Sequence, residues 1–208
     1  MKYLTLVLVT LFLNCGTLTY ILSQKWSHSF GIFAIGSWYS GSSAQRYTSI
    51  NSGTFKAYTN SPYGRLLGAG ISLNYFLQCH LGDRWLLATG PALQWASTRV
   101  KIINVNESNG NAQFSARGNT YLVNTMAGLA VALNRQWFLN QWKLAVSPSF
   151  NLWYIINGKE QGKATTNQGI EYRTNEDRST IKVDLMPGIE LKAGKNKFGF
   201  SAGYFHGL

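Results

Sequence analysis

The residues of this chain that could support acid–base or metal chemistry are three histidines, His28, His80 and His206, and two cysteines, Cys15 and Cys79. Catalysis needs an acid, a base or a nucleophile converging at one point, and a metal site needs His, Cys and carboxylate ligands at close spacing. No such spacing occurs, and the sequence has no phosphate-binding glycine loop and no nucleotide fingerprint. In the predicted order of strands, His28 and His80 fall near one end of the molecule and His206 falls near the other end. We therefore predict no catalytic, cofactor-binding or metal site, and no enzyme.

Charged residues also occur on the otherwise small and polar faces of two predicted strands. In a barrel of about eight strands the interior is just wide enough for side chains, and buried charges there must pair or meet water. We expect these charges to form a lumen network that plugs the interior together with Phe76 and Trp153; the alternative is a narrow ion path. The five residues are Lys143, Lys182, Asp184, Glu190 and Lys192. Asp184 and Glu190 are separated by about 20 Å along a strand, too far for a catalytic carboxylate pair.

The strands that carry these charged residues belong to a hairpin that occurs three times in the sequence. The lead glycines of the three copies are Gly70, Gly128 and Gly188, a spacing of about 59 residues. Each copy is a strand, a tight turn (82–84, 140–141 and 194–196), a second strand and a long polar loop. This organisation is typical of an up-and-down antiparallel barrel, with short turns at one rim and long loops at the other. We expect seven strands, at 26–40, 63–78, 85–101, 120–134, 141–157, 180–193 and 197–207, with long loops at 41–62, 102–119 and 158–179.

The predicted strands alternate with period two. In the second strand, Leu67, Ile71 and Leu73 share one face, while Gly68 and Ser72 lie on the other. A soluble lipocalin-like ligand carrier would turn the apolar face inward, and a membrane barrel would turn it toward lipid. The polar faces hold mostly Gly, Ala, Ser and Asn rather than Lys and Glu, which favours the membrane barrel. The predicted fold class is all-β, an up-and-down antiparallel transmembrane β-barrel.

Aromatic residues recur along the apolar faces at the same interval. Trp85 and Trp95 are ten residues apart, which at about 3.3 Å per residue and a tilt near 40° spans roughly 25 Å, the height of a lipid-facing band. We predict two interfacial aromatic girdles made by the pairs Trp26 and Trp38, Tyr63 and Tyr75, Trp85 and Trp95, and Trp142 and Tyr154. Pro91, Pro148 and Pro187 also lie on this face, and because proline removes a ladder donor we expect bulges there.

The composition and the amino-terminal residues agree with a location in a membrane. The 208 residues carry a net charge of +11, yet only 13% are charged, against about 25% in soluble domains. Few charges with many aromatics and glycines suit a lipid-facing protein better than a nucleic-acid binder. Lys2 and the apolar run 3–13 are typical of a secretory signal. We expect residues 1–23 to be a signal peptide and 24–208 an outer-membrane β-barrel domain, with Cys79 as its one cysteine.

The strand count is odd, whereas a bacterial barrel with both termini on one side needs an even number. Either the chain ends before an eighth strand, or a loop, in particular 41–62, hides one, and we expect the first. Two outcomes are possible for the first and last strands. Residues 30–38 and 199–207 either pair directly, strained because the two strands run parallel, or leave a gap where the eighth strand belongs.

Short motifs in the chain resemble the small outer-membrane β-barrel proteins of Bacteroidota-type bacteria, the porin-like and PorT-like barrels. The motifs are Gln-Lys-Trp at 24–26, the Ala-Gly-Ile and Ala-Gly-Leu strands, Gly90-Pro91, and the closing Gly-Tyr-Phe-His-Gly-Leu at 203–208. The resemblance implies a bacterial outer-membrane location and an eight-stranded barrel, and it carries over no active site. Some small barrels modify lipid A, and His28-Ser29 resembles a His-Ser pair of lipid A deacylases, so a lipid A acyl hydrolase is one alternative.

The outer side of the predicted barrel is polar and carries ten basic against five acidic residues, a net charge of +5, when Arg65, Arg99 and Lys101 beside the loops are counted. Basic groups near a membrane rim attract phosphorylated lipid headgroups. We expect outer-membrane lipid as a partner, and lipopolysaccharide or a surface or secretion partner through loops 41–62, 102–119 and 158–179. The alternative is that these loops are merely solvated. The predicted function is a non-enzymatic outer-membrane barrel that anchors interacting loops; a narrow porin is a further alternative.

Overall fold

The computed structural model describes residues 26–52, 57–107, 112–178, 182–195 and 198–207. The expected signal peptide, residues 1–23, lies outside this range. The described strands are β1 (Trp26–Ser37), β2 (Tyr47–Ser52), β3 (Ala57–Thr59), β4 (Gly68–His80), β5 (Trp85–Glu107), β6 (Gln113–Leu139), β7 (Trp142–Thr166), β8 (Glu171–Asp177), β9 (Val183–Lys195) and β10 (Phe198–Phe205). Within the described residues, no helix has the length and apolar character needed to cross a membrane.

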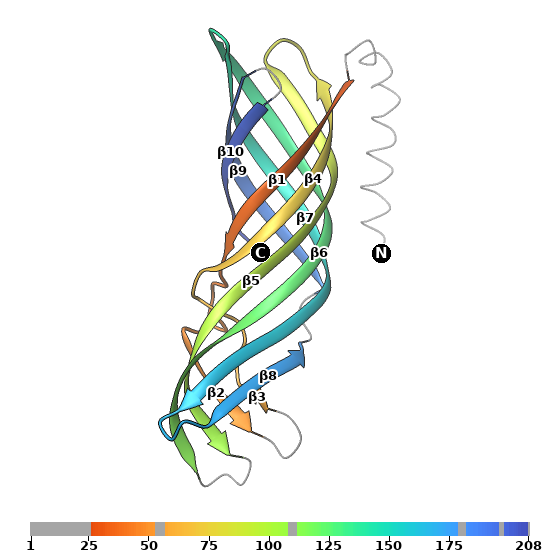
Figure 1. Cartoon of the computed structure of the whole chain (residues 1–208). Coiled ribbons are helices and arrows are strands. Elements are labelled where there is room, and N and C mark those ends of the chain that lie inside the picture. Colours follow the sequence, from red (N-terminus) through yellow and green to blue (C-terminus); the bar gives the residue numbers. More distant parts are fainter. Residues whose placement is uncertain (1–25, 53–56, 108–111, 179–181, 196–197, 208) are drawn as a thin grey trace, which may run out of the picture.

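Seven of these strands form one coiled sheet, which we call the main sheet. Its order is β1-β4-β5-β6-β7-β9-β10, and each neighbouring pair is antiparallel. The seven expected strands and the all-β antiparallel class are thus confirmed, with shifted ends. In the part of the chain that the structure describes, β1 pairs only with β4 and β10 only with β9, so the sheet is open (Figure 1). Of the two outcomes expected for the first and last strands, the described residues show the unpaired one.

Two tight turns close the hairpins at the end of the main sheet where β1 begins (Figure 1). Gly82 lies between β4 and β5 with a φ of 100°, a left-handed conformation that glycine adopts without strain. Asn140 lies between β6 and β7 with a φ of 52°, and asparagine tolerates this region better than most residues. Both turns occur where the sequence predicts them.

The expectation of three long polar loops at 41–62, 102–119 and 158–179 is wrong. β5 continues to Glu107, β6 begins at Gln113 and β7 continues to Thr166, while β8 folds back on β7 and β2 runs parallel to β5. We call β2, β3, β8 and the adjoining ends of β5 (99–107), β6 (113–121) and β7 (159–166) the outer extension. It forms the end of the molecule opposite the tight turns (Figure 1).

The outer extension is strand rather than loop because it buries an apolar cluster of its own. This cluster consists of Ile50, Ile102, Val105, Ala116 and Ala164. Apolar residues on alternate positions of neighbouring strands meet on one side of a sheet, and their burial stabilises the strands by roughly 25 cal/mol per Å² removed from water.

Bulges at the prolines are also a wrong expectation. The register shifts lie at Thr48/Ser49, Ile102/Asn104 and Thr125/Met126. At Pro91 the pairing of β5 with β4 is interrupted, and at Pro148 the pairing of β7 with β6 is interrupted. In both ladders the proline and the residue beside it are unpaired, and pairing resumes in the same register. The strands therefore accommodate the missing N–H donor of proline by a local loss of pairing, and no extra residue is inserted as it would be in a bulge.

The two faces of the main sheet differ in burial. On β5 the outward residues include Leu93 and Trp95, and the inward residues include Ala88, Ala92 and Gln94, which are buried. The sheet curls far enough that inward side chains of distant strands meet. The Lys192 ammonium of β9 lies 5.7 Å from the ring centre of Phe76 on β4.

An inward glycine makes room for the largest interior side chain. Trp153 is 3% exposed and packs with Ala92, Ala96 and Met126. A Cβ on Gly128, its partner in register across β6 and β7, would clash with the Leu152 carbonyl oxygen and would lie 2.6 Å from the Trp153 ring. The glycine that the hairpin repeat identifies therefore has a packing role inside the sheet.

Candidate functional site

The outer extension curls until β3 and β8 approach each other, and one buried carboxylate joins them. Glu160 of β7 is fully buried. Its Oε1 accepts a hydrogen bond of 3.1 Å from the Thr59 amide of β3, and its Oε2 accepts one of 2.6 Å from Arg178 Nε. Arg178 follows β8, forms an ion pair with Glu160 and donates a second hydrogen bond to the Thr59 carbonyl.

This arrangement satisfies both oxygens of a buried charge. A carboxylate without water is stable only when it is paired and hydrogen-bonded. Glu160 therefore fixes three segments, β3, β7 and the residue after β8, in one geometry. The outer extension is held as a ring even though the main sheet is open.

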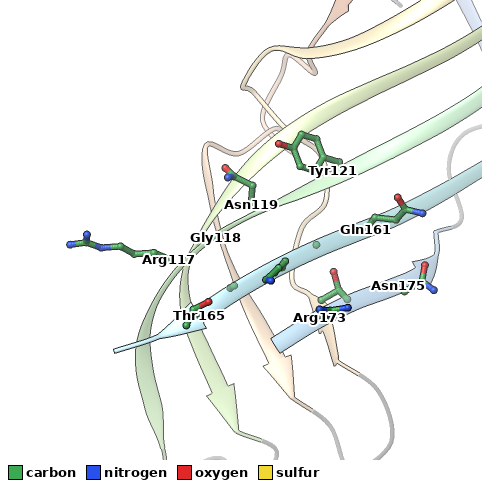
Figure 2. A pocket seen from close by; sticks show the side chains of 12 residues that line it. Arg117, Gly118, Asn119, Tyr121, Gln161, Thr165, Arg173 and Asn175 are labelled. Carbon is green, nitrogen blue, oxygen red and sulfur yellow. The ribbon is translucent and has the colours of Figure 1, made fainter. Parts of the chain in front are cut away.

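On the outward side of this ring, β6, β7 and β8 enclose an open groove of about 750 Å³ (Figure 2). Polar side chains point from alternate positions of the three strands. They are Arg117, Asn119 and Tyr121 from β6, Gln161, Lys163 and Thr165 from β7, and Arg173 and Asn175 from β8. We call this the outward groove.

The outward groove carries excess positive charge. The Glu171 carboxylate lies 2.6 Å from both Lys163 Nζ and Arg173 Nε, and these two cations hold the pKa of the Glu171 carboxyl below its usual value. Arg117 is exposed and forms no ion pair with any residue that the structure describes. Three cations thus face one carboxylate. On the next strand, Arg99 and Lys101 of β5 lie opposite Tyr121 and Asn119 in register and add to the positive field.

The groove also offers uncommitted hydrogen-bonding groups. The side-chain amides of Asn119, Gln161 and Asn175 have no hydrogen-bond partner among the described residues. An amide supplies two donors and one acceptor carbonyl. Together with the guanidinium groups and the Tyr121 hydroxyl, these amides make the surface suited to anionic, hydroxyl-rich ligands.

The five residues of the predicted lumen network lie in different surroundings. Glu190 and Lys192 form an ion pair of 2.8 Å. Asp184 is half-buried opposite Trp153, Lys143 lies 5.9 Å from the Phe138 ring centre, and Lys182 is exposed. One pair of the expected network is therefore visible, and a network of all five stays a prediction.

The residues proposed for the aromatic girdles are mostly outward. Trp26, Trp38, Tyr75, Trp85, Trp95, Trp142 and Tyr154 are all exposed. Tyr63 differs because it precedes β4 and does not share the face of Tyr75. It is half-buried and packs edge-on against Tyr39 at 5.3 Å, and the Tyr39 hydroxyl accepts a hydrogen bond from Asn124. Whether the seven exposed residues meet a lipid interface stays a prediction.

The residues that could support acid–base chemistry do not gather. His28 Nδ1 lies 2.5 Å from the Tyr75 hydroxyl on the outward side of β1 and β4. No three His, Cys, Asp or Glu side chains of the described residues lie close enough to hold a metal ion. The structure therefore offers the outward groove, made largely of residues from the predicted outer loops 102–119 and 158–179, as the candidate site.

Comparisons with protein-family models, with curated proteins and with solved structures found no match for this chain.

Proposed function

We propose that this chain is a non-enzymatic bacterial outer-membrane protein of the β-barrel class. Its main sheet lies in lipid, and its outer extension is presented to the aqueous side. The family that it would belong to is that of the small porin-like and PorT-like barrels of Bacteroidota-type bacteria. Export by a signal peptide at residues 1–23 is part of the proposal.

The observation that carries the proposal is the distribution of apolar side chains over the two faces. Large apolar residues are exposed along the outward face of every strand of the main sheet, among them Ile32, Ile71, Leu93, Leu129, Leu152, Ile189 and Phe200. Soluble proteins rarely expose contiguous apolar patches larger than a few hundred Å². The inward face is instead small and polar, with Ser72, Gln94 and Ser147 buried. Lipid is the environment in which this arrangement is stable.

The interior supports an anchoring role over a transport role. Phe76 and Trp153 fill the interior at two levels. Glu190 and Lys192 form an ion pair of 2.8 Å, and the Lys192 ammonium lies 5.7 Å from the Phe76 ring centre. A sheet of this width leaves a lumen only wide enough for side chains. We therefore expect negligible conductance.

Two measurements on the full chain test the proposal. After expression in a bacterial host, the protein should fractionate with the outer membrane, and it should migrate differently on gels with and without heating. Recovery as a soluble periplasmic monomer would overturn the membrane location. In a planar bilayer we expect no stable channel, and a large open-porin conductance would overturn the plugged interior.

A further inference from the structure

We infer that the outward groove binds the phosphorylated saccharide headgroup of an outer-leaflet lipid. This inference rests on the proposed function, because it needs the outward face of β6, β7 and β8 to stand above a lipid surface. It adds a binding site, with its ligand class, to what would otherwise be an anchored extension.

The height of the groove selects a lipid with a long headgroup. Tyr121, at the lower end of the groove, lies four residues beyond Thr125, which is the register partner of the proposed girdle residue Trp95. Arg117 lies a further four residues along β6. At about 3.3 Å per residue and a tilt near 40°, the groove spans roughly 10 to 20 Å above the level of Trp95. The glycerol phosphate of an ordinary phospholipid lies within several Å of the hydrocarbon boundary, whereas a saccharide headgroup extends into this interval.

The chemistry of the groove selects phosphate and sugar together. Arg117, Lys163 and Arg173 exceed the single carboxylate of Glu171, so an anion is attracted. Arginine forms paired hydrogen bonds with phosphate oxygens. The free amides of Asn119, Gln161 and Asn175 can donate to and accept from sugar hydroxyls, and Tyr121 offers a flat ring beside them.

The groove is also held in shape before a ligand arrives. Lys163 and Arg173 come from paired strands and share Glu171. On the opposite side of the same strands, Glu160 and Arg178 close the ring. Preorganised groups lose less conformational freedom on binding than free surface side chains do, which distinguishes this groove from a solvated basic loop.

Binding can be measured on the full chain in detergent micelles, with lipopolysaccharide as the probe. The test variant is Arg117→Gln/Arg173→Gln, which removes two cations from the groove. The matched control is Arg84→Gln/Lys195→Gln, which removes two exposed cations at the opposite end of the main sheet. We expect the groove variant to bind about tenfold or more weakly, the range for loss of charged hydrogen bonds, and the control to bind within about twofold of the original chain. Equal affinity of the groove variant and the control would overturn the inference.

Three further probes define the ligand. Lipopolysaccharide stripped of its phosphates should bind as weakly as the groove variant binds the intact lipid; equal binding of stripped and intact lipid overturns phosphate recognition. Inorganic pyrophosphate at millimolar concentration should compete only partly. A water-soluble phosphorylated core saccharide that binds as tightly as the lipid would overturn the lipid-linked source.

Failure of this inference and failure of the proposed function give different results. A protein that is heat-modifiable and fractionates with the outer membrane, yet does not distinguish the groove variant from the control, refutes the binding site alone. A protein recovered in soluble form refutes the membrane location on which the inference rests.

Discussion

Replacing Leu129 by arginine tests the membrane location at a single residue. Leu129 is 47% exposed on the outward face of β6, and its register partners are Pro91 of β5 and Leu152 of β7. Pro91 is six residues from Trp85 and four from Trp95, which at about 3.3 Å per residue and a tilt near 40° places it about 15 and 10 Å from the two proposed girdles. Leu129 is therefore near the middle of the proposed apolar band.

The two environments predict different magnitudes for Leu129→Arg. In lipid, an arginine at mid-depth of a β-barrel costs about 2–4 kcal/mol, which lowers the ratio of folded to unfolded protein by roughly 30- to 1000-fold at about 1.4 kcal/mol per factor of ten. In water, a substitution at an exposed position changes stability by about 0.5 kcal/mol or less. The difference between the two values is larger than the error of a denaturant titration.

The assay is urea unfolding of the full chain in lipid vesicles, followed by tryptophan fluorescence. Leu139→Arg is the matched control, because Leu139 is 63% exposed on the same strand and lies beside the turn to β7. Near the interface an arginine costs about 0–1 kcal/mol, so we expect Leu129→Arg to be the more damaging variant. Equal effects of the two, or a Leu129→Arg protein that stays folded in buffer without lipid or detergent, would refute the reasoning.

Three further predictions concern the interior and the outer extension. Glu160→Gln removes the charge that pairs with the half-buried Arg178 guanidinium, so we expect about 1–3 kcal/mol of local destabilisation, seen as faster hydrogen exchange at the Thr59 amide; unchanged exchange would contradict the closing role. Because the Glu171 carboxyl has a lowered pKa, its ion pairs stabilise the groove above its ordinary pKa and are lost as pH falls through the lowered one. An NMR titration should therefore give Glu171 a pKa below the usual value of a glutamate, and Lys163→Gln should raise that pKa. Gly128→Val should cost about 1–3 kcal/mol by overpacking, and Trp153→Ala in the same chain should recover part of that loss if the contact between the two is responsible.

The main sheet could be predicted from the sequence because its alternation is pure. Outward Leu, Ile and Trp against inward Gly, Ala and Ser mark each strand with a period of two, and turn residues such as Gly82 and Asn140 mark the hairpins. The odd strand count excluded a regular antiparallel closure between the first and last strands but left a direct pairing and an open edge as alternatives. These inferences depend on local pattern, which a single sequence contains.

The outer extension could not be predicted in the same way, because its apolar positions are interrupted. Between 158 and 166 the inward residues of β7 include Gly162, Ala164 and the fully buried Glu160, and such a series resembles a solvated loop. Val100, Ile102 and Val105 of β5 did alternate in part, and a register shift between Ile102 and Asn104 broke the period. Thr59 and Arg178, the partners of Glu160, lie 101 and 18 residues from it along the chain, and no local pattern identifies this ion pair.

The carboxylate of Glu160 has a consequence for the order in which the molecule folds. Its contact with Thr59 joins residues 101 positions apart, and that between Arg178 and Thr59 joins residues 119 apart, whereas the β6–β7 hairpin closes over the two residues between Leu139 and Trp142. Contacts between distant residues carry a larger loop-closure cost and form later than local hairpins. We therefore expect the hairpins of the main sheet to gain hydrogen-exchange protection first in a pulse-labelling experiment, and the Thr59 amide to gain it last. The outward groove, which is made of the consecutive strands β6, β7 and β8, would then form before the ring behind it closes, so a protein caught part-way through assembly would present the groove without the support of Glu160 and Arg178.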